Sequence, residues 1–223
     1  SPTSEAILFT SYRSALGRMY RRDFGASEDL LVQETTKEQR LQDLSSDGRY
    51  MVYAQEEPAG GDRPAHEDLW VLELGGQTAP IRVTDTVADD ANARISPNGR
   101  WLAYESNESG ALEVYVQGFP RPSAKRQVSA GGGRTPIWAP DSNELIYLTS
   151  DGWVMAAAVA SSGTGIELTA PTRLFHADLA FTGVGRIANV APDGRILLNV
   201  VPADRAPPAI VVVQNWATSV AGR

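Results

Sequence analysis

Few side chains in this sequence are of the types that bind metals or attack substrates. The chain has no cysteine and two histidines, His66 and His176. Neither histidine has a second histidine or a glutamate at the spacing with which one helix holds a zinc ion. We therefore expect both to be hydrogen-bonded or solvated loop residues. The lack of cysteine excludes disulfides, cysteine-ligated zinc and thiol nucleophiles.

Three further stretches match ligand-binding motifs in their letters alone. Residues 183–188 read Gly-x-Gly-x-x-Ala, but a strand and a turn follow them where the dinucleotide fingerprint needs a helix. Residues 131–134 fit a tight loop between strands better than a phosphate cradle. The acidic run 85–90 could hold calcium, yet it lacks an ordered ligand spacing and is better explained as a solvated loop. We expect no cofactor and no bound metal.

Composition and missing motifs exclude several function classes. The chain has no Gly-x-Ser-x-Gly pentapeptide of a hydrolase and none of the loops of a protein kinase. Its formal charge of -7, from 20 basic and 27 acidic side chains, is unlike that of nucleic-acid binders. Its longest apolar stretches, 155–160 and 209–213, are far shorter than the roughly 20 residues of a membrane-spanning helix. We expect a non-enzymatic chain with no nucleic-acid partner and no membrane insertion.

A short turn followed by a strand recurs along the chain. It is clearest as Ser96-Pro-Asn-Gly99. The other copies are Ser45-Ser-Asp-Gly48, Pro140-Asp-Ser-Asn143, Ala191-Pro-Asp-Gly194 and a degenerate Ser1-Pro-Thr-Ser4. We align one apolar strand position as Ile7, Met51, Leu102, Ile146 and Leu197, which gives spacings of 44, 51, 44 and 51 by subtraction. Periods of about 40–50 residues indicate propeller blades or helical arrays.

Alternation within each repeat decides between those two architectures. Two positions further on, the same column holds Phe9, Tyr53, Tyr104, Leu148 and Asn199. A period of two favours strands. The sequence therefore predicts an all-β fold, a β-propeller of four-stranded antiparallel blades. Its repeat units are about 1–40, 41–91, 92–134, 135–185 and 186–223, within a single domain 1–223.

The strands of individual repeats can also be placed. In the third repeat we expect strands at 93–96, 101–105, 112–116 and 126–129, and in the fourth an outermost strand at 166–174. One position of the third strand is occupied by Tyr20, Trp70, Tyr115, Met155 and Val211 in successive repeats. We expect these side chains to fill the space between sheets rather than to stack on a ligand. Trp101 and Trp138 flank turns and are expected to be partly exposed.

The first and last repeats are incomplete. The first offers strands at 6–11, 17–22 and 30–33 but no innermost strand, and the fifth lacks a convincing outermost one. We infer about five blade equivalents cut from a larger propeller, with a closed five-bladed ring as the alternative. Because unpaired strand edges invite pairing, we expect the edge at 6–11 to be covered. Another copy of the chain is favoured over the segment after Trp216 or upstream residues.

The turns resemble the Ser-Pro-Asp-Gly turn of the PD40 (WD40-like) repeat, which occurs in TolB-like proteins and in the propellers of prolyl oligopeptidase relatives. The resemblance rests on the three turns at 45–48, 96–99 and 191–194. Longer stretches resemble the C-terminal propeller region of bacterial eukaryotic-like serine/threonine kinases, namely 101–110, 113–120, 127–134, 136–140 and 211–216. The resemblance as a whole extends over essentially all of residues 1–216. The resemblance implies a bacterial β-propeller and favours a periplasmic or other extracytoplasmic location.

Antiparallel geometry predicts which face binds a ligand. The loops after the second and fourth strands of each repeat share one face, and the longer loops gather there. Long loops on a rigid scaffold are the usual place for recognition. The candidate binding residues are His66, Glu67, Asp89, Asp90, Asn107, Glu108, Arg134, Trp153 and His176.

These features predict a non-catalytic recognition module that binds a protein, a peptide or a small solute. It would be the sensor or scaffold part of a larger bacterial signalling protein. The alternative is a propeller that gates substrate access to a peptidase domain outside this sequence, and a third reading is a purely structural propeller. Self-association through the open blade edges is also expected.

Overall fold

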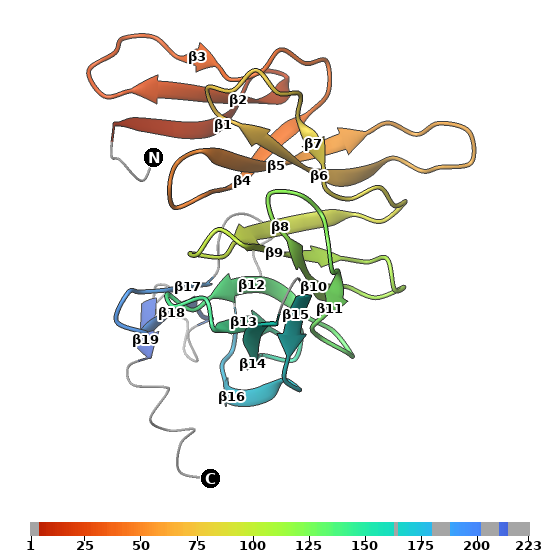
Figure 1. The fold of residues 1–223 in the computed structure, drawn as a ribbon, viewed down its shortest axis with the longest axis vertical. Coiled ribbons are helices and arrows are strands. Elements are labelled where there is room, and N and C mark those ends of the chain that lie inside the picture. The colour runs from red at the N-terminus through yellow and green to blue at the C-terminus, as the bar shows by residue number, and fades with distance from the viewer. Residues whose placement is uncertain (1–4, 163–164, 180–187, 202–209, 214–223) are drawn as a thin grey trace.

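The computed structural model describes residues 5–162, 165–179, 188–201 and 210–213. All regular elements in these residues are β-strands, so none of them is a helix that could span a bilayer. The strands form five antiparallel sheets that follow one another in chain order round an open arc (Figure 1). The predicted all-β fold of antiparallel, mostly four-stranded sheets is confirmed, and the arc is part of a propeller.

The first sheet has three strands, β1 (Ala6–Ser14), β2 (Leu16–Asp23) and β3 (Leu30–Leu31). The second holds β4 (Gln39–Leu44), β5 (Tyr50–Glu57), β6 (His66–Glu73) and β7 (Ile81–Arg82), and the third holds β8 (Asp90–Ile95), β9 (Trp101–Ser106), β10 (Glu113–Gly118) and β11 (Arg126–Gln127). The fourth has five, β12 (Arg134–Trp138), β13 (Glu144–Leu148), β14 (Trp153–Ser162), β15 (Gly165–Leu168) and β16 (Thr172–His176). The fifth holds β17 (Ala188–Val190), β18 (Ile196–Asn199) and β19 (Ile210–Val213). We call β4, β8, β12 and β17 the inner strands, because each contacts the next along the arc.

The recurring turn links each inner strand to the second strand of its sheet. The amide of Ser96 donates to the Trp101 carbonyl at 2.9 Å, and Gly99 takes a φ of 67° that favours glycine. In the fourth repeat Ser142 stands at this position with a φ of 64°. Its hydroxyl accepts a hydrogen bond from the Asn98 amide of the preceding turn at 3.0 Å. The hydroxyl of Ser46, which replaces the turn proline, donates to the Pro97 carbonyl at 2.8 Å. The two departures from the repeat pattern therefore tie neighbouring turns together.

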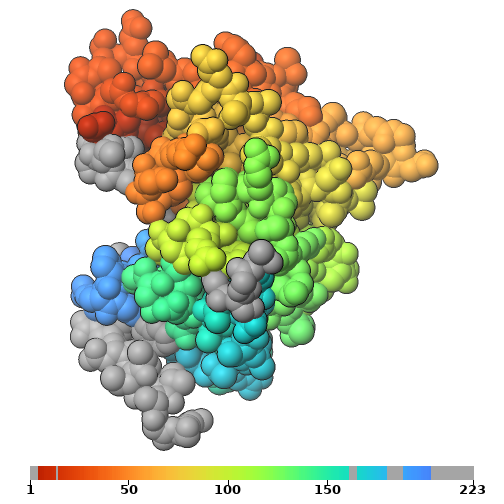
Figure 2. Space-filling view, in the orientation of Figure 1, coloured from red at the N-terminus to blue at the C-terminus, as the bar shows by residue number. Residues whose placement is uncertain are grey.

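Successive segments of the chain lie against one another along the molecule (Figure 2). Each interface between successive sheets buries an apolar cluster. Trp101 and Trp138 are 4% and 6% exposed in the cluster between the third and fourth sheets, so their predicted partial exposure is wrong. The Trp138 indole donates to the Arg94 carbonyl at 3.0 Å, which satisfies its buried N–H. The two tryptophans lie beside turns but are not exposed, because neighbouring sheets cover both faces of β9 and of β12.

Strand pairing confirms the aromatic column of the third strands. Its members Tyr20, Trp70, Tyr115, Met155 and Val211 lie opposite Phe9, Tyr53, Tyr104, Tyr147 and Leu198, respectively. Tyr104 and Tyr115 stack with ring centroids 5.9 Å apart. Trp70, Tyr115 and Met155 fill space between sheets, as expected. Tyr20 instead lies beside Phe9 on the face of the first sheet that has no neighbouring sheet.

The same pairing corrects the alignment of the second strands. The equivalent positions are Ile7, Met51, Leu102, Leu145 and Ile196. The sequence alignment was wrong by one residue at Ile146 and Leu197, and a slip of one residue moves a side chain to the other face of its sheet. In the fifth repeat the turn is one residue shorter than elsewhere. The Ala191 amide donates to the carbonyl of Arg195, whereas the equivalent bond in the third repeat runs from Ser96 to Trp101 and spans one residue more.

The outermost strand of the fourth sheet differs from the single strand predicted at 166–174. It is divided into β15, which pairs with the end of β14, and β16, which pairs with its beginning. Pro171 lies in the break, and proline has no N–H to donate to a strand ladder.

The two end sheets each leave one face without a neighbouring sheet. Ile7 is 49% exposed and Leu197 is 43% exposed, whereas Met51, Leu102 and Ile146 in the middle sheets are fully buried. The end faces therefore do not pack on each other, and the alternative of a closed five-bladed ring is not found in the described residues.

The corrected register predicts that substitutions at two neighbouring residues of β18 lower the free energy of unfolding by different amounts. Ile196→Ala should lower the free energy of unfolding by about 2–5 kcal/mol, because it empties a fully buried site. Leu197→Ala should cost less than about 1 kcal/mol, because this side chain is half exposed. Urea unfolding of both variants measures the difference. Equal losses, or a larger loss at Leu197, would contradict the register.

Candidate functional site

The loop-bearing face is defined by the ends of three strands in the third sheet. Asp90 at the start of β8 lies opposite Ser106 at the end of β9, which in turn lies opposite Glu113 at the start of β10. The loops that follow second and fourth strands therefore leave from one end of the sheet, as predicted. In the second sheet the β5–β6 loop projects from the arc on the right of Figure 1.

A buried carboxylate closes the third sheet at this face. Glu113 is 3% exposed and accepts hydrogen bonds from the amides of Gly131 and Gly132 at 2.8 and 2.9 Å and from the hydroxyl of Ser129. Ser129 Oγ also accepts from the Val114 amide at 2.8 Å. The glycine-rich stretch 131–134 thus wraps a side chain of its own sheet.

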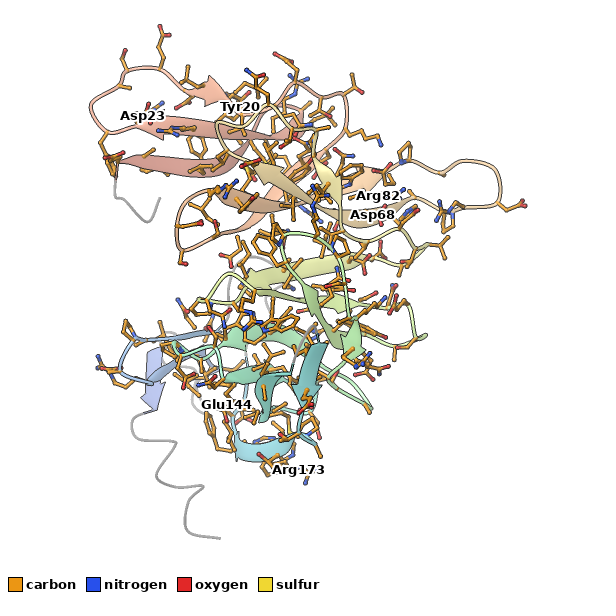
Figure 3. The ribbon with its side chains drawn as sticks, in the orientation of Figure 1. Tyr20, Asp23, Asp68, Arg82, Glu144 and Arg173 are labelled. Carbon is orange, nitrogen blue, oxygen red and sulfur yellow. The ribbon has the colours of Figure 1, made fainter. Side chains whose placement is uncertain are left out.

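The second sheet repeats this arrangement. Asp68 is fully buried and accepts from Arg82 Nε at 3.0 Å and from the Thr84 hydroxyl at 3.3 Å (Figure 3). Thr84 Oγ1 accepts from the Leu69 amide at 2.9 Å, as Ser129 does from Val114. An acidic residue on the third strand and a hydroxyl after the fourth therefore anchor β7 and β11, which have two residues each.

Asp90 is a buried carboxyl without such partners. It is 1% exposed, and no described donor makes a hydrogen bond to either of its carboxylate oxygens. Burial raises the pKa of Asp90 to about 6, an effect that the nearby hydroxyls of Ser106 and Thr84 offset only in part. In the described residues no group of three histidine, aspartate or glutamate side chains could hold a metal ion.

A groove of about 600 Å³ opens on the loop-bearing face, between the β7–β8 loop and the β9–β10 turn. Its walls and floor are Thr86, Val87, Ala88, Asn107, Glu108, Ser109, Gly110, Tyr115 and Gln127. Val87 is 55% exposed, so this apolar side chain is available to a ligand. We call this feature the loop groove.

The two walls of the loop groove are fixed to each other. The Asp89 amide donates to Asn107 Oδ1 at 3.0 Å, and Asn107 Nδ2 donates back to Asp89 Oδ2 at 3.4 Å. Within the turn, the Glu108 amide donates to Ser106 Oγ at 3.2 Å. These bonds join the two walls and fix the turn that forms one of them.

One end of the loop groove is charged. Lys125 forms an ion pair with Glu108, and its ammonium group lies 5.0 Å from the centre of the Tyr115 ring. Asp85, which directly precedes the lining residue Thr86, forms ion pairs with Arg82 at 2.8 Å and with Arg63 at 3.6 Å. The acidic run 85–90 is thus divided between ion pairs, a hydrogen bond and a buried carboxyl, which does not favour calcium binding.

The structure separates the predicted binding residues into distinct environments. Asp89, Asn107 and Glu108 meet at the loop groove. His66 begins β6, is 4% exposed and hydrogen-bonds the Pro64 carbonyl at 2.9 Å, so it is a strand residue and not the loop residue that the sequence predicted. The neighbouring Glu67 forms an ion pair with Arg40.

The remaining candidates belong to the fourth sheet. Trp153 and His176 meet edge to face with ring centroids 5.4 Å apart. The guanidinium of Arg173, which is labelled in Figure 3, lies 4.7 Å from the centre of the indole. His176 Nε2 hydrogen-bonds the Asp151 carbonyl at 2.8 Å, as expected for a hydrogen-bonded histidine. Arg134 is half-buried at the start of β12. None of these three lines the loop groove.

Of the residues that line the loop groove, the predicted set contained only Asn107 and Glu108, and it lacked the apolar contacts Val87 and Tyr115. Tyr115 was assigned to the packing column, and its ring does pack there, yet it also forms the groove floor. Val87 carries a signal that could have been read, because it is a branched apolar side chain in an otherwise polar or small-residue loop.

Comparison with known proteins identifies the fold. No family model and no curated sequence matches the chain. Among solved structures, TolB from Acinetobacter baumannii aligns with a TM-score of 0.67 at 15% identity, over 95% of this chain and 49% of that one. A puromycin-hydrolysing peptidase from Mycobacterium tuberculosis aligns with a TM-score of 0.67 at 19% identity, over 95% and 35%. An oligogalacturonate lyase in complex with manganese aligns with a TM-score of 0.66 at 13% identity, over 98% and 61%.

These likenesses support a TolB-like, PD40-type propeller, as the turns indicated. The chain spans about half the length of the TolB chain and about a third of the peptidase chain. At such low identity they establish the fold and carry no residue roles. The neighbours include both TolB and enzymes that contain propellers.

Asp90→Asn should stabilise the chain by about 2–3 kcal/mol near pH 8 and by almost nothing near pH 4, since one pKa unit corresponds to about 1.4 kcal/mol. In the folded chain the pKa of Asp90 is raised to about 6, so the folded state holds this proton up to a higher pH than the unfolded state does. The free energy of unfolding is therefore highest at low pH, where the folded and the unfolded state both hold the proton, and this contribution is lost as the pH rises through 6. Urea unfolding at both pH values measures the effect. Asp89→Asn, at an exposed neighbouring carboxyl, is the control. A gain of equal size at both pH values would refute the assignment.

Proposed function

We propose that this chain is a non-catalytic recognition module that binds a segment of a partner polypeptide in the loop groove. It serves as the sensor or interaction part of a larger bacterial signalling protein, a proposal supported by the resemblance of its sequence to the C-terminal propeller region of bacterial eukaryotic-like serine/threonine kinases. The loop groove is the observation that carries the proposal, because it is a concave, partly apolar surface on the loop-bearing face.

The lining of the loop groove suits an extended peptide. Val87 and Tyr115 offer apolar contact, and Asn107, Ser109 and Gln127 place polar side chains in the lining. The acidic side chain of the lining, Glu108, is occupied by its ion pair with Lys125. Binding is the chemistry that these side chains support.

The loop groove is formed before a ligand arrives. The hydrogen bonds between Asp89 and Asn107 join its two walls, and a buried carboxylate network holds β10 and β11 beneath it. A preformed site avoids the loss of loop entropy that weakens binding by flexible segments. Asp89 and the net charge of -7 favour a neutral or basic segment over an acidic one.

A second candidate function is a propeller that gates the access of substrates to a peptidase domain. The likeness to the peptidase structure supports this candidate, because the matched region is 35% of the peptidase chain and leaves room there for a further domain. In that case the propeller face contacts a catalytic domain and the isolated chain retains no peptide in the loop groove. The binding experiment therefore distinguishes the two candidates.

Selection of a random dodecapeptide library on the purified chain should yield peptides that bind the loop groove. Val87→Asp should weaken their binding by about tenfold or more, because it places a charge on the exposed apolar contact. Val201→Asp is a matched control, since Val201 is also 55% exposed but lies after the last sheet's second strand. Fluorescence anisotropy measures the dissociation constants.

Two results would overturn the proposal. One is a library selection that enriches no peptide. The other is a set of enriched peptides whose binding is weakened equally by both substitutions, since that would place the binding surface outside the loop groove.

A further inference from the structure

The interface between the second and third sheets buries polar side chains at its loop-bearing end. Asp90 is 1% exposed and Tyr104 is fully buried. Neither carboxylate oxygen of Asp90 has a hydrogen-bond partner among the described residues, and the Tyr104 hydroxyl has none either. These two side chains are electrostatic neighbours, and the hydroxyls of Thr84 and Ser106 lie near the same carboxylate. Four oxygen-bearing side chains therefore converge on one buried site.

The interface between the first and second sheets has glutamines at the equivalent positions. Gln39 stands opposite Gln55 at the ends of β4 and β5, just as Asp90 stands opposite Ser106 at the ends of β8 and β9. Gln39 Nε2 donates to Gln55 Oε1 at 2.9 Å, so these two long side chains bond each other across the sheet.

A third glutamine completes the first arrangement. Gln33 interacts with the hydroxyl of Tyr53, and Tyr53 occupies the position that Tyr104 has in the third sheet. The amide oxygens of Gln33 and Gln39 lack a further partner, but all of these side chains are neutral. This end of the first interface therefore satisfies its tyrosine without burying a charge.

Shorter side chains and one charge replace the glutamines in the second interface. Strand pairing aligns Thr84 with Gln33, and aspartate and serine stand at the other two positions. The shorter side chains do not reach hydrogen-bonding distance of the Asp90 oxygens. The buried oxygens thus face a gap that protein atoms fill in the neighbouring interface.

The nearby positive charges are already paired with other carboxylates. Arg82 forms an ion pair with Asp68, and Lys125 forms one with Glu108. The carboxylates of Asp68 and Glu108 act on Asp90 and add to the negative potential around it. A buried charge without a counter-charge is strongly destabilising. Because hard cations prefer oxygen ligands, one carboxylate surrounded by neutral hydroxyls suits an ion with a single positive charge.

We propose that Asp90 binds a monovalent alkali-metal cation, sodium or potassium, between the second and third sheets. Its carboxylate supplies the negative charge, and the hydroxyl oxygens of Thr84, Tyr104 and Ser106 are the neutral ligands. The site departs from our expectation of no bound metal, which rested on the histidines, the missing cysteines and the acidic run. It uses one carboxylate and three hydroxyls instead.

The bound cation joins the segments that carry the two walls of the loop groove. Thr84 and Asp90 lie on either side of the β7–β8 loop, and Ser106 precedes the β9–β10 turn. Ser106 Oγ accepts from the Glu108 amide at 3.2 Å and keeps a second lone pair for the cation. The ion lies within the sheets, so its binding does not require a ligand in the loop groove.

The experiment is a cation series on the purified 223-residue chain at pH 8. Total chloride salt is held constant, and tetramethylammonium, which is too large for the site, is replaced stepwise by sodium or by potassium. Urea unfolding gives the folding equilibrium constant at each step. Above the dissociation constant of the ion that binds, a tenfold rise in its concentration should raise this equilibrium constant about tenfold.

Variants assign the effect to the site. Asp90→Asn should reduce the change to less than about twofold, because the asparagine carries no charge to bind the ion. Tyr104→Phe, which keeps the ring and removes one ligand, should weaken the cation affinity about threefold or more. Asp62→Asn is the matched control, since Asp62 is an exposed carboxyl of the β5–β6 loop, and it should keep the full dependence.

The two chloride salts also give a signature that a purely structural aspartate would not produce. The stability gained by Asp90→Asn at pH 8 should be largest in tetramethylammonium chloride and should shrink in the salt of the ion that binds, because only the unmodified chain gains from that ion. The proposal fails if neither sodium nor potassium stabilises the chain, or if Asp90→Asn keeps the same dependence. It also fails if calcium at equal concentration stabilises the chain more, since that would indicate a divalent site.

Discussion

The packing of apolar sheet faces on one another is the interaction on which this structure depends. A sheet in the middle of the arc has no solvent-facing side, so all six residues of β9 and all six of β10 are buried. Burial on both faces explains the unbroken apolar runs within these strands, 101–104 in β9 and 114–116 in β10. At about 25 cal/mol per Å² of apolar surface, such interfaces supply most of the stabilising free energy.

Packing alone does not hold the outer strands, which are as short as two residues. Buried carboxylates do so, and Asp68 and Glu113 have the same role in successive sheets, because each bonds a hydroxyl that follows the fourth strand. These networks sit directly beneath the loop-bearing face. The rigidity of that face thus comes from polar groups that the sheets bury at their ends.

Turn chemistry and period-two alternation were enough to predict the fold, the strand order and the aromatic column. They did not determine the strand register where two apolar residues are adjacent, as at Leu145–Ile146 and Ile196–Leu197. Either residue of such a pair fits the alternating pattern, and only the packing of the neighbouring sheets decides which face each one occupies. Burial of Trp138 and formation of the loop groove also depend on contacts between repeats. Of the candidate site, Asn107 and Glu108 followed from loop position, whereas Val87 and Tyr115 required the three-dimensional arrangement.

The hydroxyls of Ser46 and Ser142 bear on how interchangeable the repeats are. Each occupies a position where the repeat pattern has proline or glycine, and each bonds the turn of the sheet next to it. An idealised array made by restoring the common residue at both positions would gain two better local turns and lose the bonds that join one unit to the next. The irregularities of this chain therefore give its units an order, so that they are not modules that could be shuffled freely.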